Sequence, residues 1–332
     1  MVKVVILGAG INGLACAVRI KEKYKDYQVT VISSDFSPNT TGDGSGGLWY
    51  PYLCGSTPLR LIEKWSGETF EFLRELWQTG AVAINLVPVY NLRLREEKFS
   101  KPDWSNVVYN FQDLDSKLLN YLNNKYSSKF VAGHTFTTFV VSPTRILTYL
   151  RKRFEQANGV ILQAKLTSLE DPILKDFDAV INCTGLGARL LVPDEKMAPI
   201  RGQIMRVYAP WQNEVIMTDN GHYIIPNIDF CVLGGTSQSS YSTEVDTKDV
   251  DFIIDGCKKM IPALQHAKII KHWAGLRPGR ESIRIESEEL NGKLRIHNYG
   301  HGGSGFTLFW GCSSEVLRLF DAFVNRKYIS KL

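Results

Sequence analysis

Three glycines near the start of the chain have the spacing of a dinucleotide-binding turn. Gly8, Gly10 and Gly13 follow a short apolar run, residues 4–7, whose β-branched content is typical of a buried parallel strand. Gly8 allows a tight turn, Gly10 lets the backbone approach a pyrophosphate, and Gly13 lets the next helix, residues 14–23, pack closely. The phosphates would lie at the free N–H groups of that helix. We therefore expect a dinucleotide, rather than a purely structural turn, at Gly8-Ala9-Gly10-Ile11-Asn12-Gly13.

The second predicted strand, Gln28–Ser33, ends without the acidic residue that usually binds a ribose hydroxyl there. Ser34 holds that position, and Asp35 follows it. We expect one of these two side chains to bind the adenosine ribose.

A glycine-rich loop and an aromatic cluster come next. Residues 37–47 contain four glycines and two threonines, which suits backbone wrapped around a flat cofactor ring, although a flexible loop has the same composition. The aromatic cluster stands at the far end of this loop. We expect the cofactor to contact Thr40, Thr41, Gly46, Gly47 and Leu48, and the substrate to contact Tyr50 and Tyr52.

Two further turns have residues suited to a cofactor. Residues 177–185 predict a buried strand that ends in Asn182-Cys183-Thr184-Gly185, and doubly wound sheets bind cofactors at the carboxyl ends of their strands. The alternative is an ordinary strand turn. Residues 296–311 contain a second glycine-rich turn before a predicted helix, whose first N–H groups would face an anionic or electron-rich group.

The pattern of apolar residues predicts an α/β protein with interleaved domains. Elements of the nucleotide-binding type lie at both ends and in the middle of the chain, so the domains are not sequential. Helices are predicted at residues 14–23, 57–79, 116–124, 143–157, 250–260 and 314–325, and strands at 4–7, 28–33, 82–95, 136–141, 160–166, 177–185, 202–208 and 223–235.

The composition is that of an ordinary globular protein. The net charge of +5 is spread over 332 residues, which gives no reason to expect nucleic-acid binding. The six cysteines lack paired spacing and predict reduced thiols, with neither disulfides nor a metal site. No apolar run approaches the roughly 18 residues that cross a membrane. The chain ends in Ser330-Lys331-Leu332, the peroxisomal address, so we expect import into the peroxisomal matrix.

Taken together, the motifs resemble those of D-amino-acid oxidases and D-aspartate oxidases, a family of peroxisomal flavoproteins, over essentially the whole chain. The likeness is greater to the D-amino-acid oxidases. The matching pieces are residues 4–13, Thr40-Thr41-Gly42-Asp43, Gly47-Leu48-Trp49-Tyr50-Pro51-Tyr52, Asn182-Cys183-Thr184-Gly185, Arg201-Gly202-Gln203-Ile204-Met205, Tyr223-Ile224-Ile225-Pro226, Gly275-Leu276-Arg277-Pro278, His297-Asn298-Tyr299-Gly300-His301-Gly302-Gly303 and the Ser-Lys-Leu terminus.

The resemblance implies a fold and a reaction. Residues 1–55, 140–190 and 270–332 would form a Rossmann-like domain with a parallel sheet that holds FAD non-covalently. Residues 56–139 and 191–269 would form a substrate domain on a mixed, mainly antiparallel sheet. The implied reaction is oxidative deamination of a D-amino acid to a 2-oxo acid, ammonia and hydrogen peroxide.

The resemblance also assigns roles to single residues. Arg277 would bind the substrate carboxylate through two parallel charge-assisted bonds, Tyr223 would donate to the same carboxylate, and the Gly303 carbonyl would accept from the amine. No side-chain base is needed, because the flavin accepts a hydride from Cα once the amine is neutral. The remaining cofactor contacts are expected from Leu166, Thr184, Gly185, Arg277, Gly302, Gly303, Ser304, Gly305, Phe306 and Thr307.

Two departures from the family pattern concern the substrate. Only five residues separate Met217 from Tyr223, where the oxidases of neutral substrates carry a longer lid with another tyrosine, so product release would be less gated. Where the aspartate oxidases place basic residues, this chain has uncharged ones, and His222 is the one nearby substitute that the sequence suggests. The uncharged residues are Tyr52, Thr218 and Ser237.

We therefore expect neutral D-amino acids to be preferred over D-aspartate, because a second carboxylate without a cationic partner loses several kcal/mol of hydration. The alternatives are a D-aspartate oxidase, a flavin dehydrogenase that uses an acceptor other than oxygen, and a protein that retains FAD without turnover. The expected partners are a D-amino acid, oxygen and the peroxisomal import receptor, with neither nucleic acid nor membrane. The sequence leaves a monomer and a homodimer open.

Overall fold

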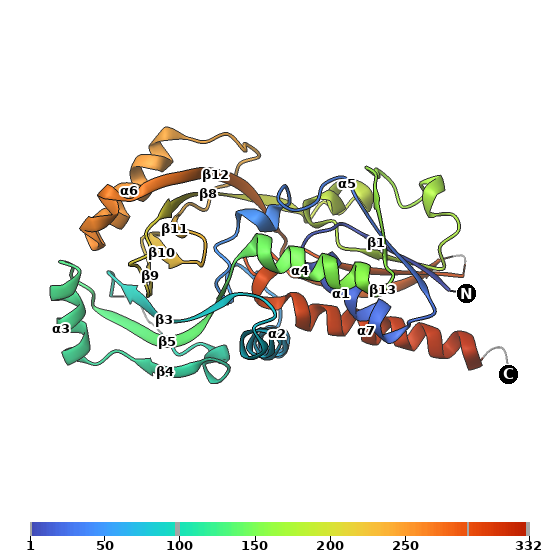
Figure 1. Cartoon of the computed structure of the whole chain (residues 1–332), viewed down its shortest axis with the longest axis horizontal. Coiled ribbons are helices and arrows are strands. Elements are labelled where there is room, and N and C mark those ends of the chain that lie inside the picture. Colours follow the sequence, from blue (N-terminus) through green and yellow to red (C-terminus); the bar gives the residue numbers. More distant parts are fainter. Residues whose placement is uncertain (1, 97–99, 291, 330–332) are drawn as a thin grey trace.

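The computed structural model describes residues 2–96, 100–290 and 292–329, and these form two sheets with their helices (Figure 1). The predicted peroxisomal signal, residues 330–332, lies outside this part of the chain. The strands are β1 Lys3–Leu7, β2 Gln28–Ser33, β3 Ile84–Arg93, β4 Tyr109–Asp113, β5 Ala132–Val141, β6 Val160–Gln163, β7 Ala179–Asn182, β8 Ala198–Tyr208, β9 Val215–Thr218, β10 Tyr223–Pro226, β11 Cys231–Gly234, β12 Lys268–Gly279, β13 Arg284–Leu290 and β14 Lys293–Tyr299. The α-helices are α1 Ile11–Lys23, α2 Leu59–Thr79, α3 Ser116–Lys125, α4 Pro143–Gln156, α5 Ala188–Leu191, α6 Thr247–Met260 and α7 Gly305–Ile329.

The first sheet has the parallel arrangement expected for a nucleotide-binding fold. Its strand order is β13-β14-β7-β1-β2-β6, and every pair is parallel except β13 with β14. Helix α1 packs against α4 and α7, and together they cover one face. The inward residues of β1 and β2 on that face are Val4, Ile6, Val29 and Val31, all fully buried. Apolar residues at every second position thus hold the helices on the sheet.

The turn between β1 and α1 depends on two glycines. Gly8 has a φ of +99°, a conformation that L side chains rarely adopt. A Cβ on Gly13 would overlap the carbonyl oxygen of Gly8. Gly10 differs, because a Cβ there would meet no atom within 4 Å. Gly13 therefore serves close packing, as predicted, while Gly10 leaves open space at the helix start.

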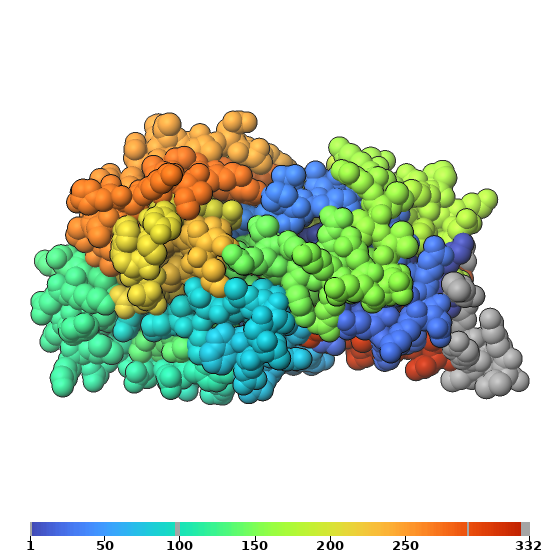
Figure 2. Space-filling view, in the orientation of Figure 1, coloured from blue at the N-terminus to red at the C-terminus, as the bar shows by residue number. Residues whose placement is uncertain are grey.

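The second sheet is mixed, as expected, and lies in the other half of the molecule. Its order is β12-β8-β11-β10-β9-β3-β5-β4, and β3 with β9 is its parallel pair, the others being antiparallel. Helix α6 packs on β8 and β11. Figure 2 shows the result, with segments from the two ends and the middle of the chain sharing one half of the molecule and the cyan, yellow and orange segments forming the other.

Helices α2 and α7 pack against each other, and Figure 1 shows α7 running from α2 toward the C-terminus under the parallel-sheet half. Gly311 makes this packing possible, since a Cβ there would overlap the backbone of Trp65 in α2. The predicted helix at 314–325 was too short, because Gly305 and Gly311 belong to α7 itself. The absence of a side chain at Gly311 serves helix packing rather than a turn.

Most predicted elements exist, with bounds shifted by a few residues, but several strands were missed. The predicted strand at 223–235 is wrong as a single strand, because Asn227 and Phe230 close a hairpin between β10 and β11 with an N–H···O distance of 2.8 Å. The missed strands are β4, β9, β12, β13 and β14. Strand β13 is largely exposed and acidic, so its conformation comes from pairing with β14 rather than from an apolar pattern.

The domain boundaries given by residue number stay a prediction. The sheets do not follow the boundary placed at residue 270. Strand β12 pairs with β8 along its whole length in the mixed sheet. Residues 270–279 were assigned to the cofactor domain, and they are part of this strand.

The six cysteines are free and buried. The closest contact among them is Cys16 with Cys183, whose Sγ atoms are 4.0 Å apart. None of the described helices has the length and apolarity to cross a membrane. Within the described residues, no cluster of three or more His, Cys, Asp or Glu side chains could hold a metal ion.

Substitution of the two turn glycines by alanine should lower stability to different extents. We expect Gly13→Ala to lower the free energy of unfolding by at least about 1–3 kcal/mol, because the added methyl group overlaps the Gly8 carbonyl. Gly10→Ala, the matched control, should cost no more than about 1 kcal/mol, since it changes only a helix N-cap. Urea denaturation of the two apoproteins measures this difference, and equal losses would contradict the packing role of Gly13.

Candidate active site

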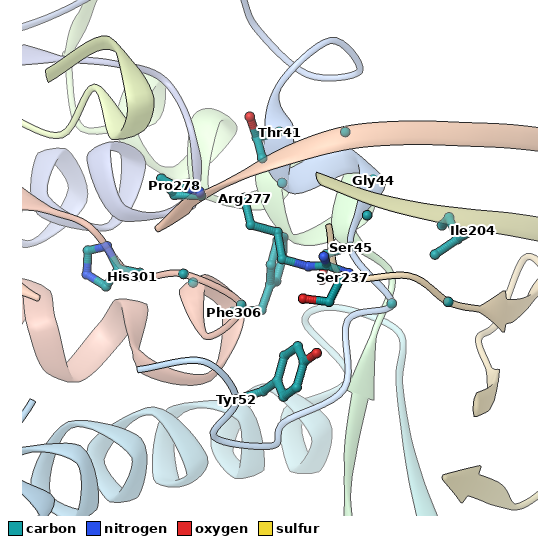
Figure 3. A pocket seen from close by; sticks show the side chains of 18 of the residues that line it. Thr41, Gly44, Ser45, Tyr52, Ile204, Ser237, Arg277, Pro278, His301 and Phe306 are labelled. Atoms are coloured by element: carbon teal, nitrogen blue, oxygen red, sulfur yellow. The ribbon is translucent and has the colours of Figure 1, made fainter. Parts of the chain in front are cut away.

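One cavity of about 1210 Å³ runs between the two sheets. That volume exceeds the roughly 300–1,000 Å³ of a typical ligand pocket, so it can hold a ligand larger than a single amino acid. Figure 3 shows its central part, with side chains from β8, β12, the first loops and the start of α7 around one space. The predicted site residues that line it are Gly8, Ala9, Gly10, Ile11, Asn12, Ser34, Asp35, Thr40, Thr41, Gly46, Gly47, Leu48, Tyr50, Tyr52, Thr184, Gly185, Thr218, His222, Tyr223, Ser237, Arg277, Gly302, Gly303, Gly305 and Phe306.

Four predicted contacts do not line the cavity. Gly13 packs under Gly8, as described above. Leu166 packs instead against the apolar cluster on the opposite face of the parallel sheet. Ser304 and Thr307 are buried, at 0% and 1% exposure, and their hydroxyls bind another segment of the chain. For Gly13, Leu166, Ser304 and Thr307 the expected contact with the cofactor stays a prediction.

One end of the cavity suits the phosphates and ribose of a dinucleotide. Helix α1 begins there at Gly10, which uses no side chain as a cap, so its first N–H groups remain available to an anion. Ser34 and Asp35 lie exposed near the end of β2, and the Ser34 hydroxyl donates to the Asp35 carboxylate at 2.7 Å. The two residues proposed as alternatives for the ribose thus act as one polar group.

A buried carboxylate holds the glycine-rich loop against the cavity. Asp43 is 1% exposed and accepts from the N–H and hydroxyl of Thr40 at 2.9 and 2.7 Å. It also accepts from Ser37 at 2.6 Å and from Thr144 in α4 at 3.1 Å. Four donors on one carboxylate fix the loop's path. The sequence motif contained Asp43, but nothing in it indicated this supporting role.

Three buried polar atoms of lining residues have no partner within the described part of the chain: Asn12 Oδ1, His301 Nε2 and His222 Nδ1. The first two lie close together, since Asn12 Nδ2 and His301 Nδ1 are 3.4 Å apart. Burial lowers the pKa of His301 to about 4, so its imidazole is neutral at neutral pH. Since orphaned buried groups cost free energy, a bound ligand with polar groups fits here. These atoms and the glycine turns make the cavity fit FAD.

Arg277 extends from β12 into the cavity (Figure 3). Its guanidinium lies over Gly202, where a Cβ would overlap it, and it donates to the carbonyls of Thr236 and Arg201 at 3.1 and 3.4 Å. Within the described residues no carboxylate lies within 4.0 Å of it. A guanidinium that donates only to neutral carbonyls can bind a carboxylate ligand, and Arg277 meets this condition.

Tyr223 stands beside Arg277 and keeps its proton. Burial raises the pKa of the Tyr223 hydroxyl, and the nearby charge of Arg277 only partly opposes that rise. The ring packs over Gly234 and Gly235, where a Cβ would overlap it. A neutral phenol beside a guanidinium offers two donors that one carboxylate could accept from.

Tyr50 and Tyr52 are held in place by the turn that starts α7. Ser304 Oγ accepts from the Tyr52 N–H at 2.6 Å and lies 2.7 Å from the Tyr52 carbonyl oxygen. Thr307 Oγ1 does the same for Tyr50, at 3.2 and 2.9 Å. The Tyr52 ring lies over Gly303, whose Cβ would meet it at 2.5 Å. Ser304 and Thr307 therefore position the tyrosines.

His222 lines the cavity but cannot serve as a cation for the substrate. Its ring packs over Gly256 in α6 and lies 4.3 Å from the Phe252 ring, centroid to centroid. Burial lowers the pKa of His222, and Lys259 lowers it further. The imidazole is thus neutral at neutral pH, which removes the one substitute that the sequence suggested for the missing basic residues.

The cavity wall contains a cation that was not predicted from the sequence. Arg93, the last residue of β3, lines the cavity, as does Asn91 two residues before it. Among the described lining residues, Arg93 and Arg277 are the Lys or Arg side chains. The premise that His222 was the single candidate for a second positive group is therefore wrong. The missed signal was an arginine at an inward-facing position of a predicted strand.

Comparisons with known proteins show which family the chain belongs to. A sequence model of the family described as FAD dependent oxidoreductase matches residues 3–319. The chain is 37% identical to a D-amino acid oxidase of Dugesia ryukyuensis, over 95% of this chain and 96% of that protein. It is 34% identical to a D-amino-acid oxidase of Rubrobacter xylanophilus, with 96% of each covered, and 32% identical to a human D-aspartate oxidase, with 97% and 96% covered.

Solved structures show the same fold at low sequence identity. A glycine oxidase from Geobacillus kaustophilus superposes with a TM-score of 0.80 at 17% identity, over 97% of this chain and 95% of that one. An L-α-glycerophosphate oxidase from Mycoplasma pneumoniae, solved with FAD bound, gives a TM-score of 0.72 at 16% identity, with 97% and 95% covered.

The Ser304 hydroxyl bonds the Tyr52 backbone, so its removal should affect the segment that carries this tyrosine. Ser304→Ala leaves the buried Tyr52 N–H without its acceptor, so we expect a loss of about 1–3 kcal/mol in stability and a higher KM. Ser313→Ala is the matched control, a fully buried serine of α7 whose hydroxyl donates to the Trp310 carbonyl rather than to a tyrosine of the site. Thermal unfolding and steady-state kinetics compare the two. A KM that rises equally in both variants would contradict a positioning role for Ser304.

Proposed function

Since the chain belongs to the FAD dependent oxidoreductase family, with D-amino-acid and D-aspartate oxidases among its relatives, we propose that it oxidises D-amino acids. Each turnover consumes one D-amino acid, one oxygen and one water, and yields a 2-oxo acid, ammonia and hydrogen peroxide. The observation that carries this proposal is the pair of carboxylate donors, Arg277 and Tyr223, in the cavity whose glycine turns fit FAD.

The residues of the cavity bind and orient the substrate. Arg277 and Tyr223 bind the α-carboxylate, and the Gly303 carbonyl accepts a hydrogen bond from the amine. Two fixed substituents of Cα, the carboxylate and the amine, together with the side on which the cofactor lies, define which hand of amino acid presents its Cα–H to the cofactor. Tyr52 is 42% exposed, and its ring lies over Gly303. No side chain of the cavity is needed as a base, because the neutral amine supplies its own electron pair.

FAD is the cofactor of the family, and we propose that it is held non-covalently. The residues that would hold it are those of the 8–12 turn, Ser34 with Asp35, the 40–48 loop, Thr184 with Gly185, and the 302–306 turn. When bound, FAD supplies the two-electron oxidising chemistry, and oxygen is the final acceptor.

We also propose that the protein acts in the peroxisome. The support is the terminal Ser330-Lys331-Leu332, which the import receptor reads. A peroxide-forming oxidase is compatible with that compartment.

One preparation tests the reaction. The purified protein should be yellow, should release its FAD on denaturation, and should consume oxygen and form peroxide when D-alanine is added. Under anaerobic conditions D-alanine should bleach the flavin. Bleaching without oxygen uptake would indicate a dehydrogenase with another acceptor, and no bleaching with any D-amino acid would overturn the proposed function.

Removal of the Arg277 guanidinium should lower transition-state binding strongly. We expect Arg277→Leu to cost about 3–5 kcal/mol, or on the order of 10²–10⁴ in kcat/KM, because the substrate carboxylate is left desolvated and unpaired. Tyr223→Phe should cost about 1.5–3 kcal/mol, since it removes one hydrogen bond to a charged group. Steady-state kinetics on folded, yellow variants measure both effects. A loss below tenfold for Arg277→Leu means that the carboxylate binds elsewhere.

Deletion of Leu332 should abolish import. A fluorescent protein fused ahead of the full chain is expected to give punctate peroxisomal signal, and the same fusion without Leu332 should be diffuse. Punctate signal from the deleted form would refute the targeting proposal.

A further inference from the structure

We propose that Tyr50 and Asn91 together determine substrate specificity, by binding the uncharged polar end of a D-amino acid side chain, above all the amide of D-glutamine. This inference rests on the proposed function and names a substrate class for it. It keeps the preference for uncharged side chains that the sequence predicted, and it adds the pair of residues that recognises them.

Strand register leads from the carboxylate donors to this pair. Asn91 in β3 lies opposite Met217 in β9, and Met217 lies opposite Tyr223 in β10. Residues directly opposite on neighbouring strands share one face of a sheet, and all three line the cavity. Since neighbouring strands are about 4.8 Å apart, Asn91 lies about 10 Å from Tyr223 along this row. The row therefore starts at a donor for the α-carboxylate and ends at a polar side chain.

Asn91 and Tyr50 form one hydrogen-bonded pair. Asn91 Nδ2 donates to the Tyr50 hydroxyl at 3.1 Å, and within the described residues neither side chain makes another hydrogen bond. The hydroxyl thus keeps its own O–H as a donor, and Asn91 keeps Oδ1 as an acceptor. If the amide is turned over, Nδ2 becomes the available donor and the hydroxyl oxygen the available acceptor. In both arrangements the pair presents one donor and one acceptor.

Both members of the pair are fixed before a ligand binds. Asn91 is 9% exposed within β3. The Tyr50 ring packs against the rings of Trp104 and Phe136, with centroid distances of 5.3 and 6.3 Å. Its backbone is bonded to Thr307. Burial raises the pKa of the Tyr50 hydroxyl, so the hydroxyl keeps its proton at neutral pH. A binding group held in this way loses little conformational entropy when a ligand arrives.

Thr218, an uncharged polar residue beside the row, is already bonded elsewhere. Its Oγ1 lies 2.6 Å from Asn220 Oδ1 and 3.0 Å from the His222 carbonyl oxygen. These contacts lie within the turn between β9 and β10, so they use the donor of the Thr218 hydroxyl. The contact with a polar substrate side chain therefore falls to Tyr50 and Asn91.

A primary amide complements this pair. Its carbonyl accepts from the available donor, and its N–H donates to the available acceptor. A carboxylate has acceptors alone, and an alkyl or thioether end leaves both groups of the pair without a partner, which costs free energy in a buried site. Met217 lies between Tyr223 and Asn91 in the row, so the side chain needs an apolar stem before its polar end. D-Glutamine has such a stem of two methylene groups.

The experiment compares kcat/KM for D-glutamine with D-methionine, which has the same length without the amide, and with D-glutamate. It uses the FAD-loaded enzyme at neutral pH. The wild-type enzyme should favour D-glutamine over each by at least about fivefold. Tyr50→Phe should lower the glutamine-to-methionine ratio by at least about fivefold, because the pair loses its hydroxyl. Asn91→Leu should lower this ratio as well.

Tyr109→Phe is the matched control. Tyr109 packs against the same apolar cluster as Tyr50 but does not line the cavity. The control removes a phenolic hydroxyl from the same surroundings, so its glutamine-to-methionine ratio should equal that of the wild type.

Each outcome decides the proposal. A wild-type enzyme that does not favour D-glutamine over D-methionine and D-glutamate overturns it, even if no variant folds. An equal loss for D-glutamine and D-methionine in Tyr50→Phe also overturns it, because that result indicates a structural role. So does a ratio that falls as much in Tyr109→Phe. If D-alanine is oxidised while D-glutamine is not, this inference fails and the proposed function stands, whereas no oxidation of any D-amino acid means that the proposed function itself has failed.

Discussion

The site depends on the close contact between the glycine turn before α7 and the segment that carries Tyr50 and Tyr52. A Cβ on Gly302 would overlap the carbonyl of Leu53, and one on Gly303 would meet the Tyr52 ring. Ser304 and Thr307 add hydrogen bonds to both tyrosine backbones. Because interiors are close-packed, the cofactor side and the substrate side of the cavity cannot move independently at this point. One turn therefore sets the distance between the two halves of the site.

The electrostatics of the cavity follow a simple division. Buried charges that support the fold are paired within the protein, as Arg201 is with Asp249 and Asp43 is with its four donors. Arg277 instead donates to neutral carbonyls, which leaves its charge for a ligand. Such an arrangement costs stability in the absence of an anion, and perturbed or unpaired groups of this kind are typical of functional sites.

The sequence predicted the parts of this site that depend on local chemistry. The turn glycines and the cofactor loop were predicted from their residue types and spacing, whereas Arg277 and Tyr223 came from the family resemblance. The roles of Asp43 and His301 were not predicted, since they depend in part on Thr144 and Asn12, which lie far away in the chain. The resemblance assigned Ser304 and Thr307 to the cofactor, and their hydroxyls bind the backbone of Tyr52 and Tyr50. Strands such as β13 were missed for the same reason, because pairing rather than an apolar pattern determines them.

The turn between β9 and β10 is short and bonded within itself. Residues 218–222 are closed by bonds from the Thr218 N–H to the His222 carbonyl and from the Gly221 N–H to the Thr218 carbonyl, at 2.9 and 3.1 Å. Gly221 is in turn tied to β11, because its carbonyl accepts from the Gly235 N–H at 2.9 Å. A turn so short and so bonded has little freedom to open and close over the cavity. The same turn is fixed to the chain just after β3, because the Asp219 carboxylate accepts from the N–H groups of Leu94 and Arg95 at 3.0 and 3.2 Å. The shortened connection that the sequence indicated as a loss of gating is thus bonded on two sides, to the end of β3 and to β11.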